Sequence, residues 1–205
     1  MPGCTMTEQS WPAAAASFLF MWVAMMIPMM LPSLVPMLWR YRDAIGDVRP
    51  GRRALLTATV GVGYFLVWSA AGLAAFPLSG ALARATPGLI GIIVLIAGAI
   101  QFTAWKARHL DCCRELTDRG SELSADSVTA WRRGLRLGVH CVYSCLALTT
   151  ILLVIGMMDI RAMAAVTTAI TLERLAPAGE QVAQAIGVVI VGAGLLMVAR
   201  ATGLA

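Results

Sequence analysis

Long runs of hydrophobic positions, separated by short polar stretches, dominate this sequence. Most runs approach or exceed the roughly 18 residues that suggest a membrane-spanning helix, and all are far longer than barrel strands. The pattern predicts an all-α, polytopic transmembrane bundle with about six spans. The fifth run is short, so five spans with a re-entrant or tightly packed fifth run is the alternative. The six runs are residues 17–38, 54–76, 88–105, 134–158, 160–175 and 182–199.

The polar stretches predict the domain organisation and the orientation. Residues 17–199 form a single helical membrane domain, preceded by a short extracytoplasmic segment, 1–16. Because this segment lacks the basic residues and small-residue cleavage site of a signal peptide, we expect the first run to remain as a helix. Two alternate connections, 40–53 and 106–133, hold 11 of the 16 Lys and Arg residues. By the positive-inside rule both are cytoplasmic, and both termini and connection 77–87 lie outside.

The composition agrees with a membrane protein and narrows the partners. Hydrophobic residues make up 59% of the 205 positions and charged residues only 13%, against about 25% charged residues in a soluble domain. The net charge of +5 follows from the two basic connections, so we expect a lipid bilayer and no nucleic acid as partner. Five cysteines, an odd number, mostly lie in or beside apolar runs, which argues against a secreted disulfide framework.

The first run carries a methionine- and proline-rich tract, residues 21–37. Thioethers are soft ligands that suit Cu(I), but methionine is also a common packing residue, so both interpretations stay open. Pro28, Pro32 and Pro36 each remove a backbone hydrogen bond. We therefore expect this side of the helix to face protein rather than lipid. The candidate ligands are Met25, Met26, Met29 and Met30.

Two cysteines, Cys141 and Cys145, lie four residues apart inside the fourth run, on one face of the predicted helix. One interpretation is a dithiolate Cu(I) or Zn(II) site completed by another helix. His140 favours it, because ionisable residues inside spans are uncommon and usually functional. The other interpretation is a seam of small residues, with Gly134 and Gly138, that lets another helix approach closely.

A second group of soft ligands follows the third run directly. His109 and Cys113 are four residues apart, and Cys112 lies between them in sequence. The nearby Lys106 and Arg108 would favour the thiolate form of these cysteines. The connection has no second closely spaced pair, so it does not form a zinc ribbon. It becomes a metal site only if it folds against the cysteine pair of the fourth run.

One acidic residue, Glu173, lies near the end of the fifth run, beside Arg174. It is either a buried partner for a basic group or an interfacial charge. We favour the interfacial charge.

Four stretches of the chain resemble a bacterial family of predicted metal-binding integral membrane proteins, a domain-of-unknown-function family. The resemblance runs from about Trp22 to Leu196. The family's loop reads Lys-x-x-Cys-Leu-x-x-Cys-Arg, and His109 and Cys113 stand at its two cysteines; Ser144 replaces one cysteine of the fourth-run motif. The stretches are residues 21–33, matching Trp-x-x-Met-x-x-Ala-Met-Met-x-Pro; 106–114; 134–145, matching Gly-x-x-x-Gly-x-x-Cys-x-Gly-Cys-Cys-Trp; and 172–174, matching a Glu-Lys pair.

The resemblance implies a multi-pass protein of the bacterial inner (plasma) membrane that binds a metal. Together with the soft ligands it predicts a non-enzymatic protein that binds Cu(I), with zinc as the alternative, for transfer, transport or homeostasis. Its partners would be the metal ion and a metallochaperone or another membrane subunit. Two other functions remain open. One is a thiol-redox protein using Cys141 and Cys145, although reactive pairs usually stand at a helix N-terminus. The other is an assembly subunit in which these residues only pack helices.

Overall fold

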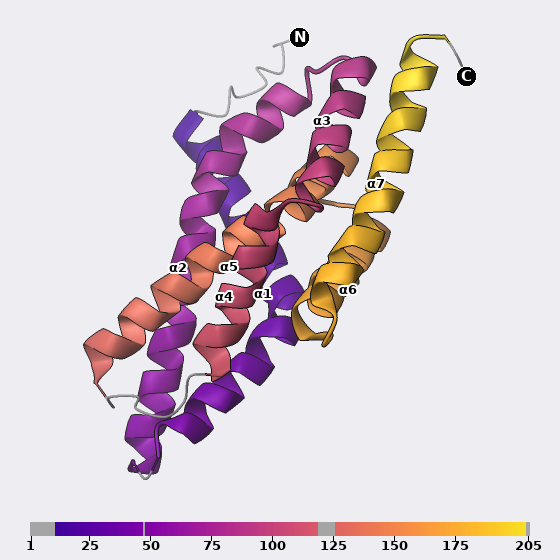
Figure 1. Cartoon of the computed structure of the whole chain (residues 1–205). Helices are drawn as coiled ribbons and strands as arrows, with labels where there is room; N and C mark the ends of the chain where they lie inside the picture. The colour runs from indigo at the N-terminus through magenta and orange to yellow at the C-terminus, as the bar shows by residue number, and fades with distance from the viewer. Residues whose placement is uncertain (1–10, 47, 119–125, 204–205) are drawn as a thin grey trace, which may run out of the picture.

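The computed structural model describes residues 11–46, 48–118 and 126–203, with the side chains of 114–118 excepted. Within these residues the chain is helical and contains no strand, which confirms the all-α prediction (Figure 1). The N-terminal segment before Trp11 lies outside the described residues. The helices are α1 (Trp11–Ala44), α2 (Pro50–Leu82), α3 (Pro87–Ile100), α4 (Ala104–Asp118), α5 (Ser127–Ile155), α6 (Ile160–Leu175) and α7 (Gly179–Ala201).

Four helices, α1, α2, α5 and α7, are each long and apolar enough to cross a membrane, and α3 with most of α4 makes a fifth candidate span. The helix α1 has 34 residues and is about 51 Å long, so it exceeds the roughly 30 Å hydrocarbon layer. The helix α6 has only 16 residues, about 24 Å. The described residues thus agree with the five-span form of the predicted bundle.

Local sequence signals set several helix ends. The side chain of Asp126 accepts hydrogen bonds from the amides of Val128 and Thr129 at the start of α5. Asp159 does the same for the first turn of α6. Such caps satisfy amides that have no partner within the helix. The helix α5 ends at Gly156, whose φ of 115° lies in the region that favours glycine.

The third apolar run is broken, unlike the single helix that its hydrophobicity predicts. The helices α3 and α4 meet at an angle of 60°. At the break, the amides of Gln101, Phe102 and Thr103 donate to carbonyls three residues back, which tightens and ends the helix. The Thr103 hydroxyl then accepts from the amide of Lys106 and starts α4. The first part of the basic connection is therefore a helix, with Lys106 and Cys113 buried.

The helices α2 and α5 pack together most extensively, as do α3 and α7. Glycine allows the first contact, because a Cβ at Gly134 would lie 2.4 Å from the carbonyl oxygen of Val60. A Cβ at Gly138 would lie 3.0 Å from the carbonyl oxygen of Tyr64. The two backbones of α2 and α5 are therefore in direct contact along this face.

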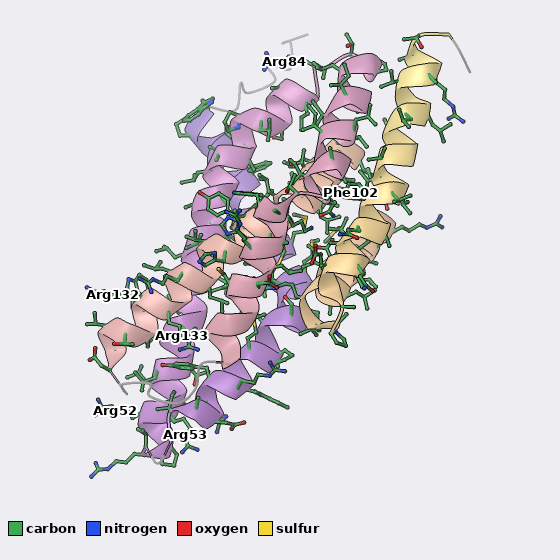
Figure 2. The ribbon with its side chains drawn as sticks, in the orientation of Figure 1. Arg52, Arg53, Arg84, Phe102, Arg132 and Arg133 are labelled. Carbon is green, nitrogen blue, oxygen red and sulfur yellow. The ribbon has the colours of Figure 1, made fainter. Side chains whose placement is uncertain are left out.

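Four arginines of the two basic connections lie at one end of the bundle (Figure 2). Figure 2 shows Arg52 and Arg53 near the start of α2, at the same end as Arg132 and Arg133 of α5. Arg84, which follows α2, lies at the opposite end (Figure 2). This separation is the one that the alternating charge pattern requires. The assignment of the basic end to the cytoplasm stays a prediction.

We expect Gly134→Ala to destabilise the protein, because the new methyl group overlaps the α2 backbone. Overpacking of this kind costs about 1–3 kcal/mol, which corresponds to a fall in Tm of roughly 2–12 °C for a chain of this size. Thermal unfolding in detergent measures it. Gly61→Ala is the matched control, since a Cβ there meets nothing within 4 Å. Equal Tm values for the two variants would contradict the close contact of α2 and α5.

The orientation can be tested by chemical labelling. In a background with Cys4 and Cys112 replaced by serine, we expect a membrane-impermeant maleimide to label Arg84→Cys in intact cells. Arg52→Cys should react only after the cells are opened, because the basic end faces the cytoplasm. Labelling of Arg52→Cys in intact cells would reverse the predicted orientation.

Candidate metal centre

The methionine tract of α1 faces the protein interior. The buried core that contains these methionines also contains the cysteine pair of α5 and a cysteine of α4. The expectation for the prolines was wrong in part, since Pro28 and Pro32 are exposed. Helical spacing puts these two prolines beside Met25 and Met29, at the edge of the methionine face. The buried sulfur-bearing residues of this core are Met25, Met26, Met29, Met30, Met37, Cys113, Cys141 and Cys145.

The two cysteines of α5 are close together and have no access to solvent. Cys141 is 0% exposed and Cys145 is 1% exposed, and their Sγ atoms are 3.9 Å apart. Both are free thiols. Two sulfur atoms that share one ion at about 2.3 Å each lie up to about 4.6 Å apart. The pair is therefore spaced to share a single metal ion.

A tyrosine and an arginine contact the sulfur of Cys141. The hydroxyl of Tyr64, on α2, lies 3.0 Å from Cys141 Sγ. Arg174, at the end of α6, donates from Nη1 to Cys141 Sγ at 3.0 Å and to Ser33 Oγ at 3.2 Å. Its Nη2 donates to Met37 Sδ at 3.4 Å. The helices α2 and α6 thus contact the Cys141 thiol of α5, and α1 contacts the arginine that reaches it.

The neighbouring acidic residue belongs to a second buried polar group. Glu173 Oε2 pairs with Lys106 Nζ at 2.7 Å, and Glu173 Oε1 accepts from Gln101 Nε2 at 3.0 Å. Lys106 also donates to the side-chain oxygen of Gln101. Glu173 is 1% exposed, so the interfacial interpretation was wrong. This group fastens α6 to the α3–α4 break.

The three predicted ligands after the third run, His109, Cys112 and Cys113, do not lie together in the structure. Cys113 is 0% exposed. Its side chain interacts with Arg174, and it is near enough to Cys141 for the charges of the two thiolates to interact. Cys112 is only half-buried and is not part of the sulfur core. The helical form of this connection explains the difference, because successive residues of a helix point in different directions.

The two histidines of the chain meet each other rather than the cysteines. The Nδ1 atoms of His109 on α4 and His140 on α5 are 3.0 Å apart. The rings of Trp105 and Tyr143 contact the ring of His109 and each other, and both residues are more than 40% exposed. This pair is partly buried between α4 and α5, and among the described residues it forms no metal-binding group with a cysteine.

Taken together, the sulfur core offers thiols and thioethers, the donor set of a soft metal ion. Among the residues that the structure describes, no three or more His, Cys, Asp or Glu side chains form a ready-made metal site. A bound ion would therefore draw on the thioethers or on a rearrangement of the thiols. Four of the contacting residues were not predicted from the sequence as part of a site: Ser33, Met37, Tyr64 and Arg174. A charged residue inside an apolar run was the available signal for Arg174.

Comparisons with known proteins give one match. No curated protein matches the chain, and no solved structure matches it. Residues 19–197 match the PpoB2 family, which is described as "Copper chaperone". The match begins within α1, before the methionine tract, and ends near the end of α7. The sulfur core described above lies wholly within the matched residues. By this match over most of its length, the chain belongs to the PpoB2 family of copper chaperones.

Proposed function

We propose that this protein is a multi-pass membrane copper chaperone that binds Cu(I) in the sulfur core and passes it on. The observation that carries the proposal is the Cys141–Cys145 pair, with sulfur atoms 3.9 Å apart, in the same buried core as the methionines of α1. The proposed ligands are Cys141 and Cys145, with Cys113 as a third thiol. The methionines provide weaker sites along α1.

The chemistry of these donors favours Cu(I) over Zn(II). Zinc sites are completed by cysteine, histidine or carboxylate ligands in tetrahedral geometry. Thioethers select Cu(I), and the residues around the cysteine pair include Met37, within 3.4 Å of the arginine that contacts Cys141. The two histidines contact each other, and among the described residues they form no metal-binding group with the cysteines. The proposed ligand set is therefore narrower than the one predicted from the sequence, and omits His109, His140 and Cys112.

A transfer function agrees better with this donor set than permanent storage does. Thioethers bind more weakly than thiolates, so a series of methionines leading to a thiol pair lets the ion move in steps. We propose the bacterial plasma membrane as the location. A metallochaperone or another membrane subunit would be the exchange partner.

A thiol-redox function is less well supported. Redox cysteines must be reached by a partner thiol or disulfide, and Cys141 and Cys145 are almost completely buried. They also lie in the middle of α5, away from the helix N-terminus that activates such thiols. The metal function therefore remains the proposal that the geometry supports best.

We expect Cys141→Ala/Cys145→Ala to remain folded and inserted in the membrane but to lose bound Cu(I). Alanine is small and apolar and fits the packed core, yet supplies no thiolate. Copper content of the protein purified under reducing conditions measures the loss. Cys112→Ala is the matched control and should keep the wild-type copper content. Full copper content in the double variant would refute the proposal and favour a purely structural role for the pair.

The separation of His109, Cys112 and Cys113 gives a second test. We expect Cys113→Ser to weaken Cu(I) binding by at least about tenfold, since loss of a ligand should exceed the effect of a supporting residue. His109→Ala should change the affinity by no more than about twofold, as expected for a site outside the core. Competition with a chromogenic Cu(I) chelator gives both values. A larger effect of His109→Ala than of Cys113→Ser would show that the histidines bind the ion.

A further inference from the structure

Arg174 places a positive charge directly beside the paired thiols. The residue is 3% exposed, and its Nη1 lies 3.0 Å from Cys141 Sγ. Its side chain also interacts with Cys113, and Cys145 is near enough for a charge on its sulfur to interact with the guanidinium. An ion bound between Cys141 and Cys145 would therefore share its immediate surroundings with this guanidinium.

The positive charge of Arg174 has the sulfur atoms as its nearest source of negative charge. Among the described residues, its hydrogen bonds run to a hydroxyl, a thiol and a thioether, and its Nε has no hydrogen-bond partner. The carboxylate next to it in the sequence, Glu173, forms an ion pair with Lys106 at 2.7 Å, so those two charges balance each other. A buried charge is costly unless an opposite charge lies near it. Arg174 therefore favours negative charge on the sulfur atoms of the centre.

The charge of the bound ion decides the charge of the loaded centre. Cysteine binds metals as thiolate, so Cu(I) held by Cys141 and Cys145 carries one net negative charge, which the guanidinium balances. A divalent ion on the same two thiolates is neutral, and the guanidinium then leaves one positive charge unbalanced in the core. With Cys113 as a third thiolate both complexes gain the same negative charge, so the copper complex stays the more negative of the two. At either ligand count, the guanidinium favours the copper complex relative to the divalent one.

We propose that Arg174 sets the charge selectivity of the copper site: its guanidinium balances the negative charge of a Cu(I)–dithiolate and disfavours divalent soft ions, such as Zn(II), at the same thiols. This inference rests on the proposed function and names the residue that makes the site specific for a monovalent ion. The hydrogen bond to Cys141 is compatible with metal binding, because a thiolate sulfur accepts an N–H bond while it ligates a metal. Soft donors select soft ions, and the guanidinium adds selection by charge.

The test compares Cu(I) with Cd(II), a soft divalent ion whose bonds to thiolates absorb in the ultraviolet, on the full-length protein in detergent. Chelator competition gives both affinities, and the absorption shows that Cd(II) occupies the cysteines. We expect Arg174→Gln to lower the ratio of Cu(I) affinity to Cd(II) affinity by at least about tenfold, because the charge that separates the two ions is removed. Arg174→Lys keeps the charge and should keep the ratio within about threefold of wild type. Arg161→Gln, at an exposed arginine near the start of the same helix, is the matched control and should behave as wild type.

A merely structural role for Arg174 predicts that both affinities fall together, so an unchanged ratio in Arg174→Gln overturns the inference. An equal fall of the ratio in Arg174→Lys overturns it as well. If Arg174→Gln does not fold, Ser33→Asp takes its place, because Ser33 Oγ lies 3.2 Å from Nη1 and a carboxylate there neutralises the guanidinium. The same fall is expected, and an unchanged ratio again overturns the inference. A wild-type protein that binds no Cu(I) would instead refute the proposed function itself.

Discussion

Two consecutive charged side chains at the end of α6, Glu173 and Arg174, are both buried, and their need for partners organises the centre of the molecule. An unpaired charge in a bundle of membrane-length helices is costly. Glu173 meets this need through Lys106 and Gln101 at the α3–α4 break. Arg174 reaches in another direction, to α1 and α5. The short helix α6 is thus joined by buried polar contacts to α1, α5 and the α3–α4 break.

The helix α5 has both features that the sequence left as alternatives, a seam of small residues for packing and a pair of close thiols. Its Gly134 and Gly138 bring α2 into backbone contact. That contact in turn places Tyr64 of α2 beside the thiol of Cys141. The same face of α5 therefore provides both the close packing against α2 and the position of the Cys141 thiol beside Tyr64. The small-residue seam is what allows the centre to form.

The sequence contained the parts of the fold that depend on local pattern. Apolar runs predicted the helices, and four-residue spacing correctly placed the methionines of α1 and the two cysteines of α5 on inward faces. The contacts of Arg174 could not be predicted, because Arg174 is 33 positions away from Cys141 in the sequence and 141 positions away from Ser33. The pairing of His109 with His140 depends on the bend before α4. Hydrophobicity alone carries no information about such a bend.

Under the proposed function, the arginines at one end of the bundle have a consequence for the form in which copper would be delivered there. Arg52, Arg53, Arg132 and Arg133 lie together there (Figure 2) and create a positive potential. A free copper ion approaching this end is repelled. A copper ion already held by two thiolates carries a net negative charge and is attracted. Copper delivered at this end would therefore be favoured in the thiolate-bound form over the free ion, before it reached any ligand of the core.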